Sequence, residues 1–340
     1  MRFRLPLLAG LLLLPGAAMA QVQAGPTLTA VRAKGTVDCA VSPGTPGFGA
    51  PDSQGVYRGL DPDTCRAVAA AVFGDASRTR FVPVAGGQRP TSVQTGAVDI
   101  VTSTFTWSHS RDTANALNFA AINFYDGQSF LVRRSANITS SRDLAGAAIC
   151  TTAGSTSELN VADWARANNL QYRPVVFERA DEARNAYASG RCDAYSTDAS
   201  QLAAIRSALA NPADHIVLEE RISKEPLGLA VRHGDDQWLD IVRWSFYALV
   251  EAEELGITQA NVDEMLNSQL PAVRRLLGTS GEHGPMMGLD RRWAYNIIKA
   301  LGNYGEIYER NLGPNTPIGL QRGVNNLWNR GGLMYVPPIR

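Results

Sequence analysis

The hydrophobic pattern of this chain predicts strands and helices in alternation. Apolar residues from Cys65 to Val72 recur at helical spacing, with Asp61 as the expected helix cap and Gly74 as the expected end. Short apolar runs between turn residues predict buried strands. In the first part of the chain the pattern predicts strands at 37–41, 81–84 and 98–102, and a short helix near Thr91.

A second unit with the same alternation begins after Asn123. Its first helix is expected at 156–167, with Ser155 or Thr156 as the cap. A later strand is expected at 226–231, and the pattern beyond it is mostly helical. The unit itself is expected to hold strands at 147–151, 175–177, 192–196 and 216–218, and further helices at 181–189 and 199–209.

Two units of alternating strands and helices predict an α/β protein with two lobes. The second lobe interrupts the first, so that two chain crossings, near 124–128 and 223–227, form a hinge. The expected division is a leader at 1–20, the first part of lobe 1 at 21–125, lobe 2 at 126–225, and at 226–340 the rest of lobe 1 with a helical C-terminal extension.

The first twenty residues have the pattern of an export signal. Arg2 and Arg4 are basic, an apolar run extends from Leu5 to Leu14, and an A-x-A sequence ends at Ala20. The apolar run is short for a membrane-spanning helix, and no later run is longer. We therefore expect cleavage after Ala20, a periplasmic location and no direct membrane insertion.

The charge balance argues for a small polar ligand. The chain of 340 residues has 32 Lys and Arg against 32 Asp and Glu, and loss of the leader brings the net charge to about −2. No basic patch or run is present, which argues against nucleic acid and anionic membrane surfaces as partners. The 320 residues that follow the leader are enough for two domains with cores of their own.

The cysteines favour disulfides over a metal site. An even count in an exported chain favours disulfide bonds, and Cys39, Cys65, Cys150 and Cys192 have neither CxxC nor metal-ligand spacing. The four histidines are scattered along the chain. We expect neither a metal nor a cofactor.

An arginine and an acid follow two of the expected strands. A free amino acid is a zwitterion, and a site for it needs a cation for the carboxylate and an anion for the ammonium. Arg111 follows a turn rich in hydroxyl groups, and its planar fork suits a carboxylate. Asp198 follows a strand as well, although an acid at that position can simply cap the next helix. Asp193 is expected to make structural bonds.

The turn at 154–157 offers a second anion-binding element. Its sequence, Gly-Ser-Thr-Ser, precedes a helix whose first backbone N–H groups have no partner within the helix. The alternative is an ordinary helix cap with Glu158 in the first turn.

Together these motifs resemble the periplasmic substrate-binding proteins of polar amino-acid ABC transporters, solute-binding protein family 3, and most of all its general L-amino-acid-binding branch. The resemblance covers nearly all of the chain after the leader. The motifs are GLDPDTCRAV at 59–68, GAVD at 96–99, WSHSRD at 107–112, AGSTSEL at 153–159 and GRCDAYSTD at 190–198, with GNYGE at 302–306 and RGVN at 322–325 for the branch.

The resemblance implies a two-lobe binding-protein fold of type II that closes on a ligand in the cleft. It implies that Arg111 and Thr156 bind the ligand's carboxylate, that Asp198 binds its ammonium, and that Thr104 and Thr106 help to hold both groups. The neighbouring Ser103, Ser155 and Ser157 are further candidates. The segment at 43–48 lacks the aromatic residue that many smaller relatives stack on the ligand, and Phe48 is the candidate substitute.

The resemblance also implies the disulfides Cys39–Cys65 and Cys150–Cys192. Each pair lies within one lobe, whereas a bond between lobes would restrain the hinge. The implied partners are a free L-amino acid and the permease of an ABC transporter in the inner membrane, with the binding protein itself a monomer. Broad L-amino-acid binding is implied, with Glu, Gln, Asp and Asn as the possible preference.

Two other functions are compatible with such a fold. An enzyme, such as a dehydratase or lyase acting on a small carboxylate, needs a catalytic acid or base, and Asp198 is the one candidate. His109 beside the binding arginine has no paired nucleophile or carboxylate and is expected to be exposed. A membrane-tethered sensor module needs a transmembrane segment after the leader, and the sequence offers none.

Overall fold

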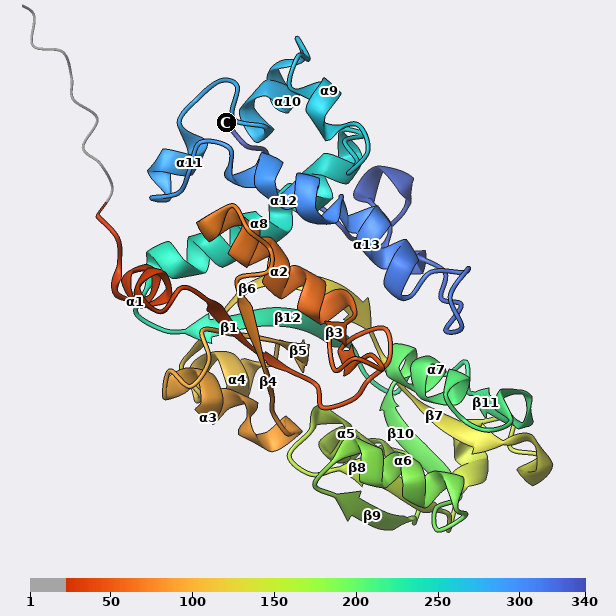
Figure 1. Ribbon diagram of the computed structural model, residues 1–340. Helices are drawn as coiled ribbons and strands as arrows, with labels where there is room; N and C mark the ends of the chain where they lie inside the picture. Colours follow the sequence, from red (N-terminus) through yellow and green to blue (C-terminus); the bar gives the residue numbers. More distant parts are fainter. Residues whose placement is uncertain (1–22) are drawn as a thin grey trace, which may run out of the picture.

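The computed structural model describes residues 23–340 as two lobes, each built on one five-stranded sheet (Figure 1). The expected leader and its cleavage site at Ala20 lie outside the described residues. Lobe 1 has the strand order β4-β1-β5-β12-β6, in which β12 is antiparallel to both neighbours. Its strands are β4 (Thr79–Pro83), β1 (Val37–Val41), β5 (Ile100–Thr106), β12 (Glu225–Arg232) and β6 (Leu117–Asp126), with a small hairpin of β2 (Ala50–Pro51) and β3 (Tyr57–Arg58).

Helices cover both faces of the lobe 1 sheet (Figure 1). The larger core contains Cys39 and Leu229 from the sheet and is covered by α1 (Pro26–Lys34), α2 (Leu60–Phe73), α8 (Asp236–Glu254) and the later helices. On the other face, Val101 and Phe105 pack with Val93 of α3 (Arg89–Gln94), near α4 (His109–Thr113). The later helices are α9 (Val262–Met265), α10 (Pro271–Leu276), α11 (His283–Met286), α12 (Trp293–Leu301) and α13 (Tyr304–Asn311).

Lobe 2 follows the same plan on a smaller scale. The strand order is β11 (His215–Val217), β7 (Gln128–Arg133), β10 (Ala194–Asp198), β8 (Ala148–Thr152) and β9 (Arg173–Phe177), and the helices are α5 (Thr156–Ala167), α6 (Ala180–Ala188) and α7 (Ala199–Ser207). Leu131 and Tyr195 pack with α6 and α7 on one face of the sheet, whereas Phe130 and Ile149 pack with α5 on the other.

Two strand crossings join the lobes, and they lie side by side. Glu225 pairs with Asp126 at the end of the β6–β12 ladder, and the backbone N–H of Ile222 donates to the carbonyl of Gln128 at 2.9 Å. Between them Gly127 has no room for a side chain, because a Cβ would lie 2.7 Å from the carbonyl oxygen of Ser223. The crossings therefore form a narrow two-stranded connection.

The C-terminal extension packs on lobe 1 and reaches the hinge. Arg322 donates to both carboxylate oxygens of the buried Glu253 at 3.1 and 3.2 Å. Asn325 accepts from the backbone N–H of Tyr125 at 2.7 Å and donates to its carbonyl at 2.9 Å. The extension thus fixes the backbone of β6 just before the chain crosses to lobe 2.

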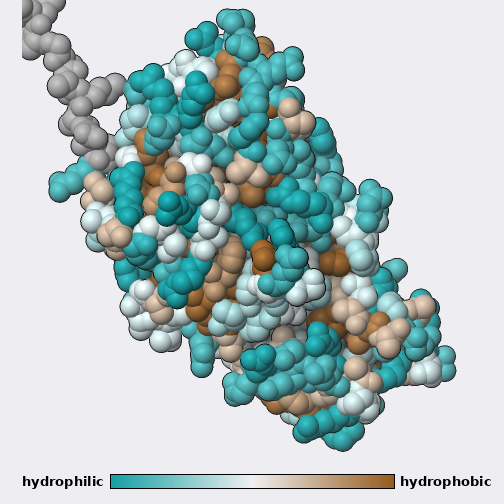
Figure 2. Space-filling model, in the orientation of Figure 1, coloured by the Kyte–Doolittle hydropathy of each residue, from teal (hydrophilic) through white to brown (hydrophobic). Residues whose placement is uncertain are grey.

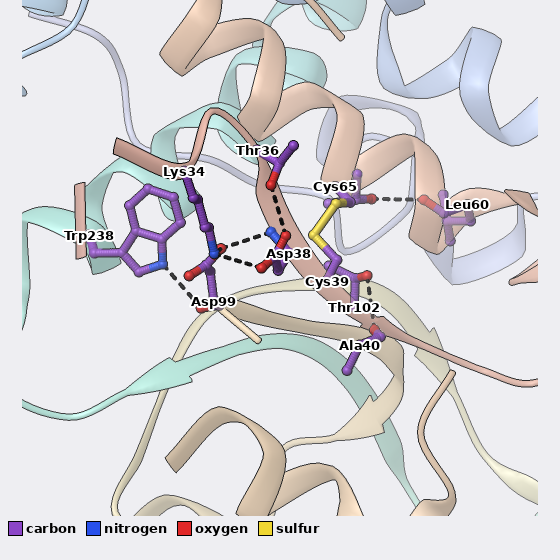
Figure 3. Close-up of a disulfide and its surroundings, with 11 residues drawn as sticks. Lys34, Thr36, Asp38, Cys39, Ala40, Leu60, Cys65, Asp99, Thr102 and Trp238 are labelled. Atoms are coloured by element: carbon purple, nitrogen blue, oxygen red, sulfur yellow. Dashed lines mark hydrogen bonds and ion pairs between the residues drawn. A yellow bond between two sulfur atoms is a disulfide. The ribbon is translucent and has the colours of Figure 1, made fainter. Parts of the chain in front are cut away.

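Each lobe contains one disulfide, as expected. Cys39 of β1 is bonded to Cys65 of α2, with 6.3 Å between the Cα atoms (Figure 3). Beside this bond, Lys34 bridges the carboxylates of Asp38 and Asp99 at 2.8 and 2.6 Å. In lobe 2, Cys150 of β8 is bonded to Cys192 before β10, with a Cα separation of 5.8 Å.

Most expected elements form close to the expected bounds, but the expected role of Asp61 is wrong. Gly59 occupies the N-cap position of α2, and Asp61 turns its carboxylate to Thr104 and Asn123 instead. Polar residues cover most of the face shown in Figure 2, and the apolar residues on it form small patches. Among residues 23–340, no helix has the length and apolar character to cross a membrane.

Candidate functional site: the cleft between the lobes

A cavity of about 290 Å³ lies between the two lobes. It is bordered by the carboxyl ends of β5 and β10 and by the start of α5, where ligands of open α/β sheets usually bind. Both lobes contribute hydroxyl groups and charged groups to its wall. The polar lining includes Ser42, Thr45, Gln88, Arg89, Thr104, Thr106, Arg111, Thr152, Ser155, Thr156, Ser157, Glu178, Arg179, Tyr195, Thr197, Asp198 and Gln201.

Thr104 is held in an unusual backbone conformation. Its φ of 38° lies in the left-handed region, which a β-branched residue rarely adopts. Its backbone N–H donates to Asp61 Oδ2 at 3.0 Å, and Asn123 supports the other oxygen at 3.3 Å. Burial raises the pKa of Asp61 to about 7. Strain at such a position is typical of a functional site.

Arg111 lies on α4, directly after β5. Ser108 caps this helix, and the guanidinium of Arg111 stacks on the ring of Phe105 at 4.2 Å and donates to the carbonyl of Thr106 at 2.8 Å. No ion pair joins Arg111 to an acid among residues 23–340. Burial, and next the charge of Arg89, lower the pKa of Arg111 to about 10. The Arg111 guanidinium is therefore a positive charge in a fixed position that can bind an anion.

The expected turn of lobe 2 faces the same cavity. The Ser155 side chain caps α5 by accepting from the N–H of Glu158 at 3.2 Å, as the sequence suggests. Thr156 and Ser157 follow it and also line the cavity. The hydroxyl oxygens of Thr106 and Thr156 lie 3.4 Å apart, which brings the two lobes together at this point.

Asp198 lies at the end of β10 with 3% of its surface exposed. It occupies the N-cap position of α7, but its side chain makes no capping hydrogen bond and accepts from Gln201 instead. Burial, followed by the charges of Asp126 and Glu225, raises the pKa of Asp198 well above its usual value. A ligand cation beside this carboxyl would offset the unfavourable charge. Asp193 is structural, as expected, and accepts from the N–H of Ala148 at 2.7 Å.

The sequence reasoning missed Arg89. It begins α3, lines the cavity and donates to the carbonyl of Thr104 at 3.4 Å, while its buried Nε has no hydrogen-bond partner among the described residues. Burial lowers its pKa to about 10, against the opposing effect of Asp61 and Asp198. No sequence signal marks it, because a lone arginine at a helix start is usually a surface residue.

Seven of the eight ligand-binding candidates from the sequence line the cavity. The exception is Ser103, which is 0% exposed, does not line the cavity and has no partner for its hydroxyl among the described residues. Phe48 is not part of the lining either, because it is buried against Phe124 with ring centroids 5.2 Å apart. The expectation that Phe48 replaces the missing aromatic is therefore wrong. His109 is exposed, as expected.

Two α/β lobes joined by two crossings, with a polar cavity between them, define the class of two-lobe binding proteins. The sequence profile of the bacterial extracellular solute-binding proteins, family 3, matches residues 37–260. The chain belongs to this family.

The chain is similar to two amino-acid-binding proteins over nearly its whole length. It is 53% identical over 316 residues to the general L-amino acid-binding periplasmic protein AapJ of Rhizobium johnstonii, covering 92% of this chain and 93% of the relative. It is 52% identical over 315 residues to the glutamate/glutamine/aspartate/asparagine-binding protein BztA of Rhodobacter capsulatus, again covering 92% and 93%.

A solved structure of a related protein has the same fold as this chain. A periplasmic binding protein from Brucella ovis with glutathione bound has 51% sequence identity and a TM-score of 0.91, covering 93% of this chain and 100% of that one. The expected two-lobe fold is confirmed. Family and relatives are solute-binding proteins rather than enzymes, so the interpretation as a binding protein is confirmed over the dehydratase or lyase alternative.

Proposed function

We propose that this protein captures free L-amino acids, with a preference for Glu, Asp, Gln and Asn, and delivers them to the permease of an ABC transporter in the inner membrane. The observation that carries the proposal is that Arg89, Arg111 and Asp198 line one cavity, and none of them forms an ion pair among the described residues. The other charged residues of the lining are Glu178 and Arg179, and Arg179 is paired with Asp181. An acidic amino acid has two carboxylates and one ammonium, and the three unpaired groups offer two cations and one anion to match them. The names of AapJ and BztA support the same ligand class.

In the proposed complex each ligand group has a partner. Arg111 and the backbone N–H groups at the start of α5, in the turn of Ser155, Thr156 and Ser157, take the α-carboxylate. Asp198 takes the ammonium, together with acceptors of Thr104 and Thr106. Arg89 takes the carboxylate or amide at the end of the ligand side chain, because it lines the same cavity and has no ion-pair partner among the described residues.

A thermal-shift screen of the twenty L-amino acids tests the proposal, because a ligand that binds only the native state raises the melting temperature by mass action. Glu, Asp, Gln and Asn are expected to give the largest shifts, and calorimetry should then give affinities for each. The absence of a shift with every amino acid would contradict the proposed function.

Glutathione is a second candidate ligand. The Brucella relative carries it, and the cavity of this chain continues to Glu178 and Arg179, which could contact a ligand longer than one amino acid. Glutathione therefore belongs in the same screen. A larger shift with glutathione than with glutamate would make it the preferred ligand.

The proposed mechanism requires the lobes to close on the ligand. Thr106 and Arg111 belong to lobe 1, and Thr156 and Asp198 to lobe 2, so a ligand that bridges them favours the closed form. Small-angle scattering should give a smaller radius of gyration with saturating ligand. An unchanged radius with confirmed binding would contradict closure.

We also propose cleavage after Ala20, release to the periplasm, a monomeric state, and lobe boundaries at 21–125, 126–225 and 226–340. Mass spectrometry of the exported protein and sedimentation analysis test the first three directly.

A further inference from the structure

Glu225 lies behind the wall of the cavity, at the point where the chain returns to lobe 1. It is the first residue of β12, it is 1% exposed, and it does not line the cavity. One of its oxygens, Oε2, accepts from Thr106 Oγ1 at 2.5 Å and from Thr156 Oγ1 at 3.0 Å. A single carboxylate oxygen therefore joins a hydroxyl of lobe 1 to a hydroxyl of lobe 2.

The second oxygen of Glu225 is also fully used. Oε1 accepts from Asn160 Nδ2 and from Ser223 Oγ, both at 2.6 Å. A carboxylate accepts hydrogen bonds and donates none. All four partners must therefore point their hydrogens at Glu225, and the arrangement leaves little freedom for any of them to turn.

This arrangement decides what the two threonines can offer a ligand. A hydroxyl group has one hydrogen and two acceptor sites. Thr106 and Thr156 both line the cavity, and both have given their hydrogen to Glu225. Toward the cavity their hydroxyl oxygens can only accept. The matching ligand group is a donor, such as an ammonium, and a carboxylate would face two oxygens that repel it.

We infer that Glu225 is a positioning residue that sets the Thr106 and Thr156 hydroxyls as acceptors for the ligand's ammonium. The inference rests on the proposed function. It changes the expected role of Thr156, whose hydroxyl is assigned to the ammonium, while its backbone N–H at the start of α5 stays available for the carboxylate. Glu225 thereby contributes to the choice of an amino acid over a plain carboxylic acid.

The test compares L-glutamate with glutarate, which lacks only the amino group, by calorimetry on wild type and Glu225→Gln. The amide group of the glutamine can donate a hydrogen bond to one of the two threonines. The hydroxyl hydrogen of that threonine is then free to point toward the cavity. The ratio of the two affinities should then fall by about tenfold or more, the size of a hydrogen bond to a charged group. Glutarate binding itself should change less. Glu219→Gln, at an exposed position nearby, is the matched control and should leave the ratio unchanged.

A second pair of variants keeps the test valid if Glu225→Gln folds poorly. Thr156→Val removes the acceptor with little change of shape and should lower the same ratio, whereas Thr156→Ser should preserve it. Suppose that the wild type binds glutamate. An unchanged ratio of glutamate to glutarate affinity in Glu225→Gln would then overturn the inference but not the proposed function. If Glu225→Gln does not fold, an unchanged ratio in Thr156→Val would do the same. Failure of the wild type to bind any amino acid would overturn the proposed function and the inference with it.

Discussion

Arg89 and Arg111 come from different helices of lobe 1, yet both line the same cavity, and the charge of Arg89 helps to lower the pKa of Arg111. Two like charges at close range are unfavourable, and neither arginine has an ion-pair partner among residues 23–340. This arrangement fits a ligand with two anionic groups, as in the proposed complex. In that complex the two arginines have different roles, which substitution can distinguish.

Replacing Arg111 by alanine should weaken the binding of every amino acid. The α-carboxylate is common to all of them, and its loss of a charged partner typically costs about 2–5 kcal/mol. Arg111→Lys should lose less, because it keeps the charge but lacks the fork and the planar group that stacks on Phe105. Calorimetry measures both, with Arg142→Ala at an exposed position as control. Affinity near wild type in Arg111→Ala would contradict the assignment.

Replacing Arg89 by alanine should change selectivity rather than abolish binding. The affinity for L-glutamate should fall by about tenfold or more relative to that for L-alanine, which has no group to reach Arg89. The Arg111→Ala protein is the useful comparison, because there both ligands should weaken together. If the affinities for L-glutamate and L-alanine fell equally in Arg89→Ala, Arg89 would support the site without contacting the ligand's side chain.

Ligand binding should release a proton at Asp198. The pKa of its carboxyl is raised in the free protein by burial and by Asp126 and Glu225, whereas a ligand ammonium favours the ionised form. Affinity should therefore rise as the pH rises toward the raised pKa of the free protein. Calorimetry in phosphate and in Tris at one pH gives the number of protons released. Asp126, whose pKa burial raises to about 6, is the nearby group that must be varied as well, with Asp126→Asn.

Asp198→Asn should make the ligand-free protein more stable while it weakens binding. An acid whose pKa is raised on folding binds its proton more tightly in the native state, so the native state loses stability as the pH rises above the ordinary value of 3.8. An asparagine side chain does not ionise, so the variant avoids this loss of stability at neutral pH. Thermal melts at pH 5 and pH 8 check the sign, since the advantage of the variant should be larger at pH 8.

Loss of the Cys150–Cys192 bond should destabilise lobe 2 more than it disturbs binding. The bond spans 42 residues of sequence, and closing a loop of that length is worth about 3–4 kcal/mol in the chain-entropy account. The double serine variant should melt earlier, yet bind ligand at 25 °C if lobe 2 remains folded. The double serine variant of Cys39 and Cys65 should likewise destabilise lobe 1. A melting curve unchanged in both variants would contradict a structural role for these bonds.

From the sequence alone one could predict the elements, the two lobes and seven of the residues that line the cavity. Strand and helix patterns are local, so the apolar run at 37–41 and the cap at Ser155 identify their elements without knowledge of the rest of the chain. The family motifs then assigned Arg111 and Asp198 to a binding site, and both line the cavity. The disulfide pairs followed from the same resemblance.

Which side chains act together depends on contacts that form only in the folded protein. Arg89 and Glu225 carry no local signal, because their importance comes from neighbours far away in sequence, such as Thr104 for Arg89 and Thr156 for Glu225. Ser103 shows the converse, since it adjoins the candidate Thr104 in the sequence but is buried away from the cavity. Hydrogen-bond direction and shared burial depend on how two lobes meet, and a pattern along one chain does not contain that information.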